Sequence, residues 1–259
     1  MTTEITSRAQ DSVGWIRLDG ADRLNPIGTK TYTELARAVR EFEGQQSVRA
    51  IVVHGAGRVF SAGADIEEIR GFGDRAEFEN FIHGFTDALD VIATSALPVI
   101  AAVHGVAMGG GLELALACDM RVATPEAKLG LPEAKLGVLP GAGGTQRLPR
   151  VVPLGVASEM LMLGNAITGE RAYAVGLVNR LADADGLLDT AAELARQLAA
   201  GSAQVPSATK ALLRATAHLT VTDGIEQERR VAADLFDTPD GREGFAAFLE
   251  KRPPRFVRE

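Results

Sequence analysis

The chain has 259 residues, of which 46% are hydrophobic and 24% charged, values that suit a folded protein with a sizeable core. Asp and Glu outnumber Lys and Arg by 34 to 27, a formal net charge of −7, which argues against a surface for nucleic acid or anionic membranes. The single Cys118 excludes an internal disulfide. The sequence has neither an apolar signal core at its start nor an unbroken apolar membrane span. A cytoplasmic location is therefore expected.

The first half of the chain alternates between predicted strands and helices. Residues 13–18 alternate in polarity like a half-buried strand, whereas residues 50–53 form a short apolar run typical of a buried parallel strand. Helices are predicted at 29–42, 75–95 and 112–117, and further strands at 99–103 and 120–123. Strands that alternate with helices require crossover connections, so the pattern predicts an α/β fold with a mostly parallel sheet.

The final third is predicted to be mainly helical. Helical segments are expected at residues 153–163, 169–174, 187–200, 207–219, 224–236 and 241–250. In the third of these, Leu187, Ala191 and Leu194 begin a single apolar stripe that continues to Leu198. Such helices are suited to packing on the first domain or on neighbouring subunits.

A glycine-rich segment joins the predicted strand 99–103 to a helix and ends at a glutamate. Gly109, Gly110 and Gly111 lie at the helix start, where backbone N–H groups are free and the helix dipole is positive. Glycine also allows a ligand to approach the backbone, so the segment suits an oxygen that gains negative charge during a reaction. The structural alternative is a tight turn in which Glu113 only complements the helix dipole.

A second loop of small residues follows the predicted strand 50–53. It reads Phe-Ser-Ala-Gly-Ala-Asp-Ile at residues 60–66 and could present another backbone N–H to the same oxygen. It is not a nucleophile elbow, because Val59 occupies the position of the first glycine in G-x-S-x-G. An ordinary surface loop would have a similar composition.

The third candidate is Glu133, which lies among apolar residues whose burial would raise its pKa and let it hold a proton near neutral pH. The segment Glu-Ala-Lys-Leu-Gly at 126–130 recurs at 133–137, so Glu126 and Glu133 must be told apart. The glycines at 141–144 resemble a phosphate cradle but lack the Gly-Lys-Ser/Thr ending of a P-loop. No metal site is expected, because the four histidines are widely separated and no partner cysteines accompany them.

In this order, the motifs resemble those of the crotonase superfamily, in particular the enoyl-CoA hydratases. The resemblance spans nearly the whole chain, and the ordered combination is more specific than any fragment. The matching segments are residues 60–66, 109–115, 118–119, 132–133, 140–148 and 172–178.

The resemblance implies a spiral of ββα units at 1–195 followed by a C-terminal helical trimerisation region at 196–259. It also implies a homo-oligomer, a trimer or a dimer of trimers. The matched positions imply Glu113 and Glu133 as the catalytic pair and the backbone N–H groups of Ala64 and Gly110 as an oxyanion hole. The implied coenzyme A contacts are Ala62, Ala64, Asp65, Ile66, Glu67 and Gly110.

The implied activity is hydration of 2-enoyl-CoA to 3-hydroxyacyl-CoA, as in fatty acid β-oxidation. Glu113 would activate water and Glu133 would protonate C2, and Glu126 would have no role in the site. The acyl-CoA thioester is the expected partner, with coenzyme A part of the substrate and no metal or redox cofactor required. The alternatives are a Δ3,Δ2-enoyl-CoA isomerase, a noncatalytic RNA-binding relative and a structural scaffold. The acidic charge balance disfavours RNA binding.

Overall fold

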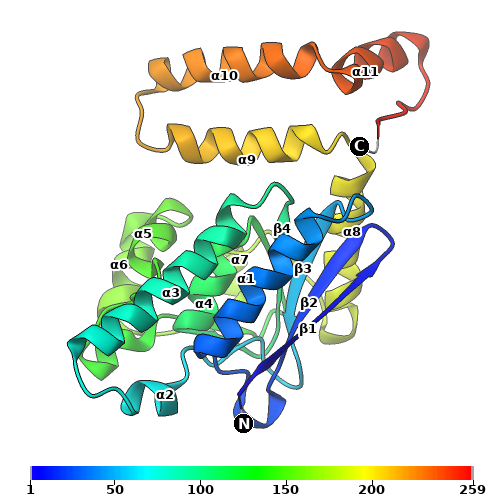
Figure 1. Ribbon diagram of the computed structural model, residues 1–259. Coiled ribbons are helices and arrows are strands. Elements are labelled where there is room, and N and C mark those ends of the chain that lie inside the picture. Colours follow the sequence, from blue (N-terminus) through cyan, green and yellow to red (C-terminus); the bar gives the residue numbers. More distant parts are fainter. Residues whose placement is uncertain (1, 258–259) are drawn as a thin grey trace.

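The computed structural model describes residues 2–257 and is built around a twisted six-stranded sheet (Figure 1). The strands lie in the order β1 (Glu4–Gln10), β2 (Val13–Asp19), β3 (Ala50–Gly55), β4 (Val99–Val103), β6 (Met120–Ala123) and β9 (Arg180–Leu181). The hairpin β1–β2 is antiparallel and the other neighbours are parallel. The predicted mostly parallel sheet is therefore confirmed.

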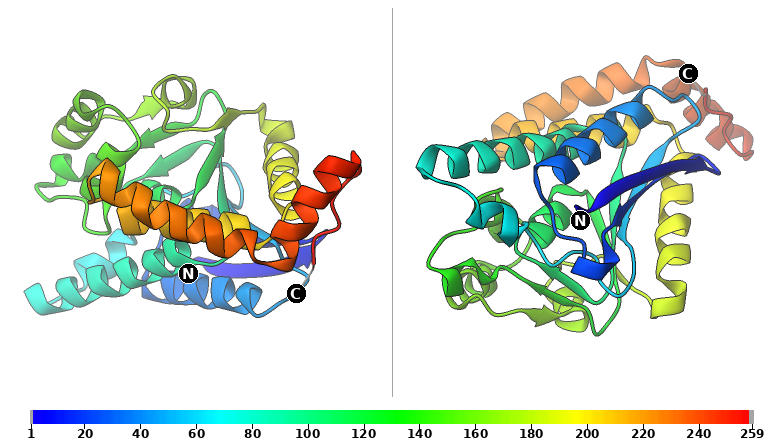
Figure 2. Two further views of the ribbon diagram at one scale, coloured as in Figure 1. Left: turned by 90° about the horizontal axis from the view of Figure 1, so that it is seen from above. Right: turned by 60° about the horizontal axis from the view of Figure 1, so that its bottom comes forward.

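Helices cover both faces of this sheet, which is why β3 and β4 consist of apolar runs rather than alternating residues. One face packs against α1 (Thr29–Glu43), which in turn packs on α3 (Arg75–Thr94), and the other face against α8 (Leu187–Ala200) (Figure 2). The predicted apolar stripe of α8 is confirmed, because Leu187, Ala191, Leu194 and Ala195 are buried against the sheet.

A smaller sheet lies beside the first and consists of β5 (Val106–Met108), β7 (Lys128–Gly130) and β8 (Ile167–Thr168). Strands β4 and β6 each pass from the large sheet into a strand of the small sheet, and a helical segment follows. The stretch after β3 does the same, because Ser61 forms a parallel bridge with Ala107 before α2 (Ile66–Arg70) begins. This repetition is the predicted spiral of ββα units.

The remaining elements complete the core with mostly short helical turns. They are η1 (Ala21–Arg23), α4 (Gly110–Ala117), η2 (Pro132–Leu136), α5 (Gly144–Arg147), η3 (Leu148–Arg150), α6 (Leu154–Leu163), α7 (Gly169–Ala174) and η4 (Ala184–Gly186). Sequence reasoning missed β1, whose residues are almost all exposed, and the strands of two or three residues, which are too short for a periodicity to show. Across residues 2–257, no helix combines the length and the apolar character that crossing a membrane would require.

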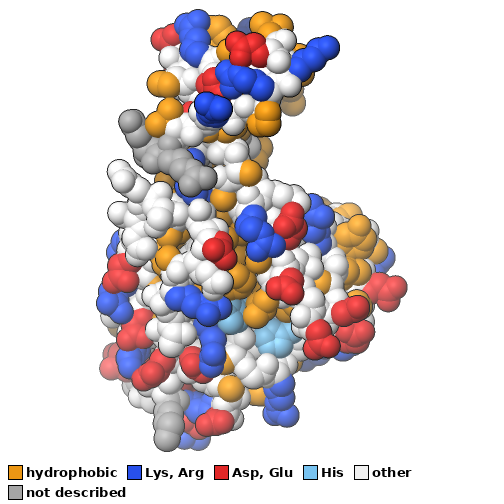
Figure 3. All heavy atoms as spheres, turned by 90° about the vertical axis from the view of Figure 1, so that its right-hand side faces the viewer, with side chains coloured by type: hydrophobic (Ala, Val, Ile, Leu, Met, Phe, Trp, Pro, Cys, Tyr) orange, Lys and Arg blue, Asp and Glu red, His pale blue; other side chains and the backbone are white. Residues whose placement is uncertain are grey.

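Three C-terminal helices form a layer apart from the sheet: α9 (Gln204–Thr216), α10 (Val221–Phe236) and α11 (Pro239–Glu250). In a side view they stand as a narrower lobe above the core, with hydrophobic side chains among the charged ones (Figure 3). Lys210 of α9 anchors the layer, because its Nζ donates to Asp119 Oδ2 at 2.8 Å and to the carbonyl of Ile92 at 2.9 Å. The predicted division between residues 195 and 196 falls within α8.

Candidate active site

The register of two parallel segments brings the two predicted N–H donors together. Ser61 pairs with Ala107: Ser61 N donates to Val106 O at 3.0 Å, and Met108 N donates to Ser61 O at 3.1 Å. Three residues further along each segment lie Ala64 and Gly110. A Cβ added to Gly110 would stand 3.2 Å from the Ala64 nitrogen, so the two main chains are in direct contact.

Among residues 2–257, the N–H groups of Ala64 and Gly110 have no hydrogen-bond acceptor. Gly63 O accepts from Ile27 N, and Asp65 N donates to Ile27 O. Because successive N–H groups of an extended chain point to opposite sides, the N–H of Ala64 points away from Ile27. Gly110 opens α4, so its N–H has no carbonyl one turn earlier in the helix. The fold therefore presents two neighbouring donors at one edge of a cavity.

Two glycines make this approach possible. Gly63 has φ of +111°, and a Cβ there would lie 2.7 Å from Met108 O. A Cβ on Gly110 would lie 2.8 Å from Phe85 Cε1. A larger residue at Gly63 would force the two segments apart, and one at Gly110 would displace the Phe85 ring.

Asn25 holds the loop that leads to Ala64. Its side chain is buried, and Nδ2 donates to the carbonyls of Ala56 and Val59 at 2.9 Å. In return, Ser61 Oγ donates to Asn25 O at 2.8 Å. Sequence reasoning did not identify this role, although an asparagine in a turn-rich segment was a signal for local backbone hydrogen bonding.

Glu113 lies one turn after Gly110 on the same face of α4, and this residue is only 3% exposed. Its Oε1 accepts from Ala142 N and Gly144 N, each at 2.8 Å. Burial raises the pKa of Glu113 to about 7, and the charge of Glu133 adds to this rise while the two N–H donors oppose it. The glycine run that resembled a phosphate cradle therefore binds a carboxylate of the same chain.

Glu133 reaches the same cavity from η2. The pairing of β5 with β7 lets Gly109 N donate to Gly130 O at 2.9 Å, so the turn after β7 lies beside the start of α4. Burial raises the pKa of Glu133. Its Oε2 is buried and has no hydrogen-bond partner within residues 2–257. Glu126 precedes β7, is exposed and does not line the cavity.

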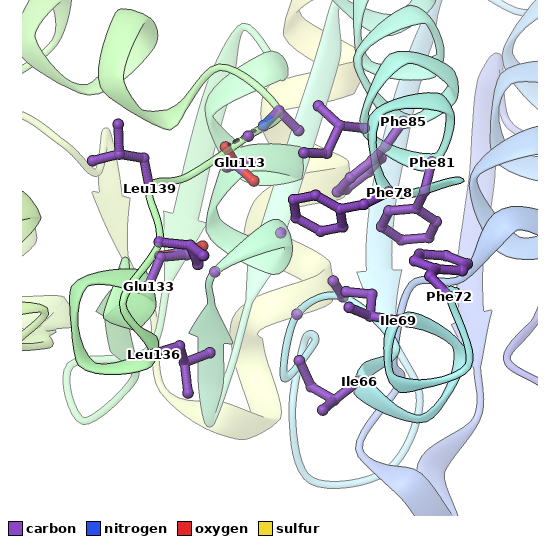
Figure 4. A pocket seen from close by; sticks show the side chains of 18 of the residues that line it. Ile66, Ile69, Phe72, Phe78, Phe81, Phe85, Glu113, Glu133, Leu136 and Leu139 are labelled. Carbon is purple, nitrogen blue, oxygen red and sulfur yellow. Dashed lines mark hydrogen bonds between the residues drawn. The ribbon is translucent and has the colours of Figure 1, made fainter. Parts of the chain in front are cut away.

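The cavity has a volume of about 620 Å³, a size typical of small-molecule sites. Figure 4 shows Glu113 and Glu133 on one side, facing phenylalanines of α3 and isoleucines of α2. The structure thus brings four predicted residues together: Ala64, Gly110, Glu113 and Glu133.

The predicted coenzyme A segment is divided by the fold. Ala62, Ala64 and Ile66 line the cavity. The side chain of Asp65 instead caps α2 through Glu67 N at 3.1 Å and pairs with Arg23 at 3.0 Å. The carboxylate of Glu67 also contacts Arg23, at 3.0 Å. Contacts of Asp65 and Glu67 with coenzyme A stay predictions.

The described part of the chain contains no group of three or more His, Cys, Asp or Glu that could hold a metal ion. His104, beside the glycine segment, is half-buried, and its Nε2 lies 3.0 Å from Gly57 O. Burial lowers the pKa of His104. This histidine thus has a structural contact with the loop after β3.

Known proteins share both the sequence pattern and the fold of this chain. The family model described as enoyl-CoA hydratase/isomerase matches residues 8–259. The chain belongs to this family. The enoyl-CoA hydratase/isomerase family is the one implied by the resemblance of the motifs, so that prediction is confirmed.

Family members similar to this chain include two bacterial proteins named probable enoyl-CoA hydratase. The one from Rhizobium meliloti is 38% identical over 248 residues, which cover 95% of each chain. The one from Bacillus subtilis is 38% identical over 236 residues, which cover 91% of this chain and 92% of the relative. The crystal structure of an enoyl-CoA hydratase from a Polaromonas species matches with a TM-score of 0.94 at 32% identity, covering 98% of this chain and 99% of that one. The crotonase-type fold is therefore established.

Proposed function

We propose that this chain adds water across the double bond of a 2-enoyl-CoA thioester to form a 3-hydroxyacyl-CoA. The thioester oxygen would accept hydrogen bonds from the N–H groups of Ala64 and Gly110. Attack on C3 moves electrons onto this oxygen, and loss of one such donor typically costs about 2.7–4 kcal/mol of barrier. The supporting observation is that this N–H pair and two buried glutamates line a single cavity.

The two carboxyl groups are set up for different halves of the reaction. The two N–H donors on Glu113 favour its charged form, so we assign it the base that takes a proton from water as the water oxygen attacks C3. The buried, unpartnered Oε2 of Glu133 favours a protonated carboxyl, and we assign it the acid that protonates C2. Proton exchange with solvent restores both groups.

The assay that tests this function follows the loss of the conjugated enoyl absorbance when purified protein is mixed with 2-enoyl-CoA thioesters and no added metal. We expect a 3-hydroxyacyl-CoA product. A product in which the double bond has moved, with no water added, would instead identify an isomerase. Absence of turnover with every enoyl-CoA would reject the proposal.

Substitution of the glutamates tests the assignment of the acid–base pair. We expect Glu113→Gln and Glu133→Gln each to lower kcat about 100- to 10,000-fold, the usual contribution of a general acid or base. Glu126→Gln is the matched control, because Glu126 belongs to the duplicated segment but is exposed outside the cavity. Near-normal rates in the first two variants would contradict the mechanism.

We also propose that the protein assembles as a trimer or a dimer of trimers through its C-terminal helices. Neither α9 nor α10, both described in full, has a buried residue, although each is amphipathic. Large apolar side chains on this layer are exposed, namely Val205, Leu213, Val221, Ile225, Phe236, Phe245, Phe248 and Leu249. Exposed apolar surface of this extent is typical of a protein–protein interface.

A further inference from the structure

An aromatic wall extends from the proposed oxyanion hole along α3. Phe78, Phe81 and Phe85 lie on one face of the helix and line the cavity, joined by Phe72 from the loop after α2 (Figure 4). Phe85 contacts Gly110, since a Cβ added to that glycine would lie only 2.8 Å from the ring. The wall therefore begins where the thioester carbonyl would bind, and it spans about 10 Å from Phe85 to Phe78 at 1.5 Å per residue.

Most of this wall is held from behind. Tyr32 of α1 stacks on Phe85 with ring centroids 5.7 Å apart and meets Phe81 edge-on at the same distance. Phe81 in turn contacts Phe72 at 5.6 Å. These contacts hold Phe81 and Phe85 against α1 and leave the space in front of the two rings open. Phe78 is half-buried and points into that space.

The opposite side of the cavity is apolar and exposed to solvent. Leu136 is 65% exposed and Leu139 is 74% exposed, although both line the cavity. Ile66 stands across from them at 59% exposure. An apolar ligand that covers such exposed side chains removes a large apolar area from water, and this burial favours binding.

The ionisable groups of the cavity are all acidic. Among the described residues that line it, Asp74, Glu113 and Glu133 are the carboxyl groups, and no Lys or Arg is present. A ligand with a terminal carboxylate would therefore find no cation to pair with and three acids near it. The chemistry of the walls favours a ligand without polar substituents.

We infer that the acyl group of the substrate is bulky and wholly apolar, either an unbranched chain of about eight carbons or more or a group that bears an aryl ring. The inference rests on the proposed hydration. A crotonyl group has a single methyl beyond its double bond and would leave most of the aromatic wall in water. Each further methylene that reaches the wall raises the affinity by a factor of about four.

The first test measures kcat/KM for 2-enoyl-CoA substrates of four, six, eight and ten carbons, for cinnamoyl-CoA, and for an eight-carbon substrate with a terminal carboxylate. We expect kcat/KM to rise at least tenfold from four to eight carbons, and the carboxylate to lower it at least tenfold. The cinnamoyl arm shows whether bulk close to the double bond is accepted as well as length. Equal values for the four-carbon, eight-carbon and cinnamoyl substrates, or tolerance of the carboxylate, would overturn the inference.

The second test truncates the walls. We expect Phe78→Ala and Leu139→Ala each to lower the ratio of the eight-carbon to the four-carbon kcat/KM about tenfold. Leu154→Ala is the matched control, because Leu154 is 71% exposed on α6 and does not line the cavity, so the ratio stays at the wild-type value. An unchanged ratio in both wall variants would assign the acyl group to another surface.

A binding measurement separates this inference from the proposed reaction. Calorimetry with saturated butyryl-CoA and octanoyl-CoA requires no chemistry, and we expect octanoyl-CoA to bind at least tenfold more tightly. Tighter binding of the longer thioester without hydration would reject the proposed function and keep the acyl site. Hydration without length dependence in either measurement would do the reverse.

Discussion

At the scale of single residues, the fold gives one residue type two different environments. Glu113 is held by two backbone N–H groups, whereas Oε2 of Glu133 is buried without a partner among the described residues. Burial raises the pKa of both carboxyl groups. Different surroundings, rather than different side chains, are what allow two glutamates to divide the work of acid and base.

The pKa of Glu113 predicts how stability depends on pH. Burial raises this pKa from 4.5 to about 7, so the folded state binds the proton more tightly than the unfolded state does. The resulting stabilisation is full below about pH 4.5 and is lost as the pH rises through about 7. Glutamine does not titrate, so the Glu113→Gln variant lacks this pH dependence. Its free energy of unfolding relative to the wild type should therefore rise by about 2–3 kcal/mol between pH 5 and pH 8.

Denaturant unfolding at equal protein concentration measures this difference at each pH. Glu126→Gln is the control, since its exposed carboxyl has no comparable burial. A stability difference between Glu113→Gln and the wild type that is the same at pH 5 and pH 8 would contradict the raised pKa.

At the scale of elements, the glycine loop before α5 acts as a support for the active-site carboxylate. Arg147 of α5 donates to Ala142 O at 2.7 Å and to Asp90 Oδ1 of α3 at 2.7 Å. It thereby ties the peptide segment that binds Glu113 to the helix that forms the aromatic wall. Its positive charge also lowers the pKa of Glu113, against the larger effect of burial.

Arg147→Met should therefore loosen the loop and raise the pKa of Glu113 further. We expect kcat/KM at pH 7 to fall about tenfold or more, because small displacements of a catalytic group are costly. We also expect the acidic limb of the pH profile of kcat/KM to move to higher pH, since Glu113 must be ionised to act as a base. Arg150→Met is the control, because Arg150 is exposed and binds Gln146 O. A profile unmoved in Arg147→Met would show that the loop holds without it.

At the scale of the whole molecule, an α/β core carries a helical layer whose large apolar side chains are exposed to solvent. The core buries its apolar residues in two clusters on either side of the large sheet. The layer has no comparable cluster among the described residues. An ion pair between Asp119 and Lys210, whose side chain is 9% exposed, joins the layer to the core. This contrast is the basis for the proposed assembly.

Analytical ultracentrifugation tests the assembly directly. We expect the wild-type protein to sediment as three or six chains. The double substitution Phe248→Glu and Leu249→Glu places charges on side chains of α11 that are 82% and 80% exposed, and it should shift the protein to smaller species. Leu188→Glu on α8 is the control, at 40% exposure and outside the helical layer. A wild-type protein that sediments as a single chain would reject the proposed oligomer.

Local patterns of the sequence predicted most of the long elements, and the resemblance of the ordered motifs to a known family implied the residues of the candidate site. Helices such as α1 and α3 and strands such as β3 and β4 were predicted because periodicity reports which faces of a segment are buried. The ordered motifs around Ala64, Gly110 and Glu133 identified the family. By contrast, β5 and β7 have three residues each and carry no periodicity, yet their pairing places the turn that carries Glu133 beside the start of α4.

Only the tertiary structure decided what each buried group meets. It assigned the N–H groups of Ala142 and Gly144 to the carboxylate of Glu113. It also assigned Asp65 to the cap of α2 and Asn25 to the loop before Ala64. It also placed the phenylalanines of α3 in front of the reacting groups. The physical reason is that a local pattern specifies whether a side chain leaves water, whereas its partner is set by the register and packing of segments that are distant in the chain.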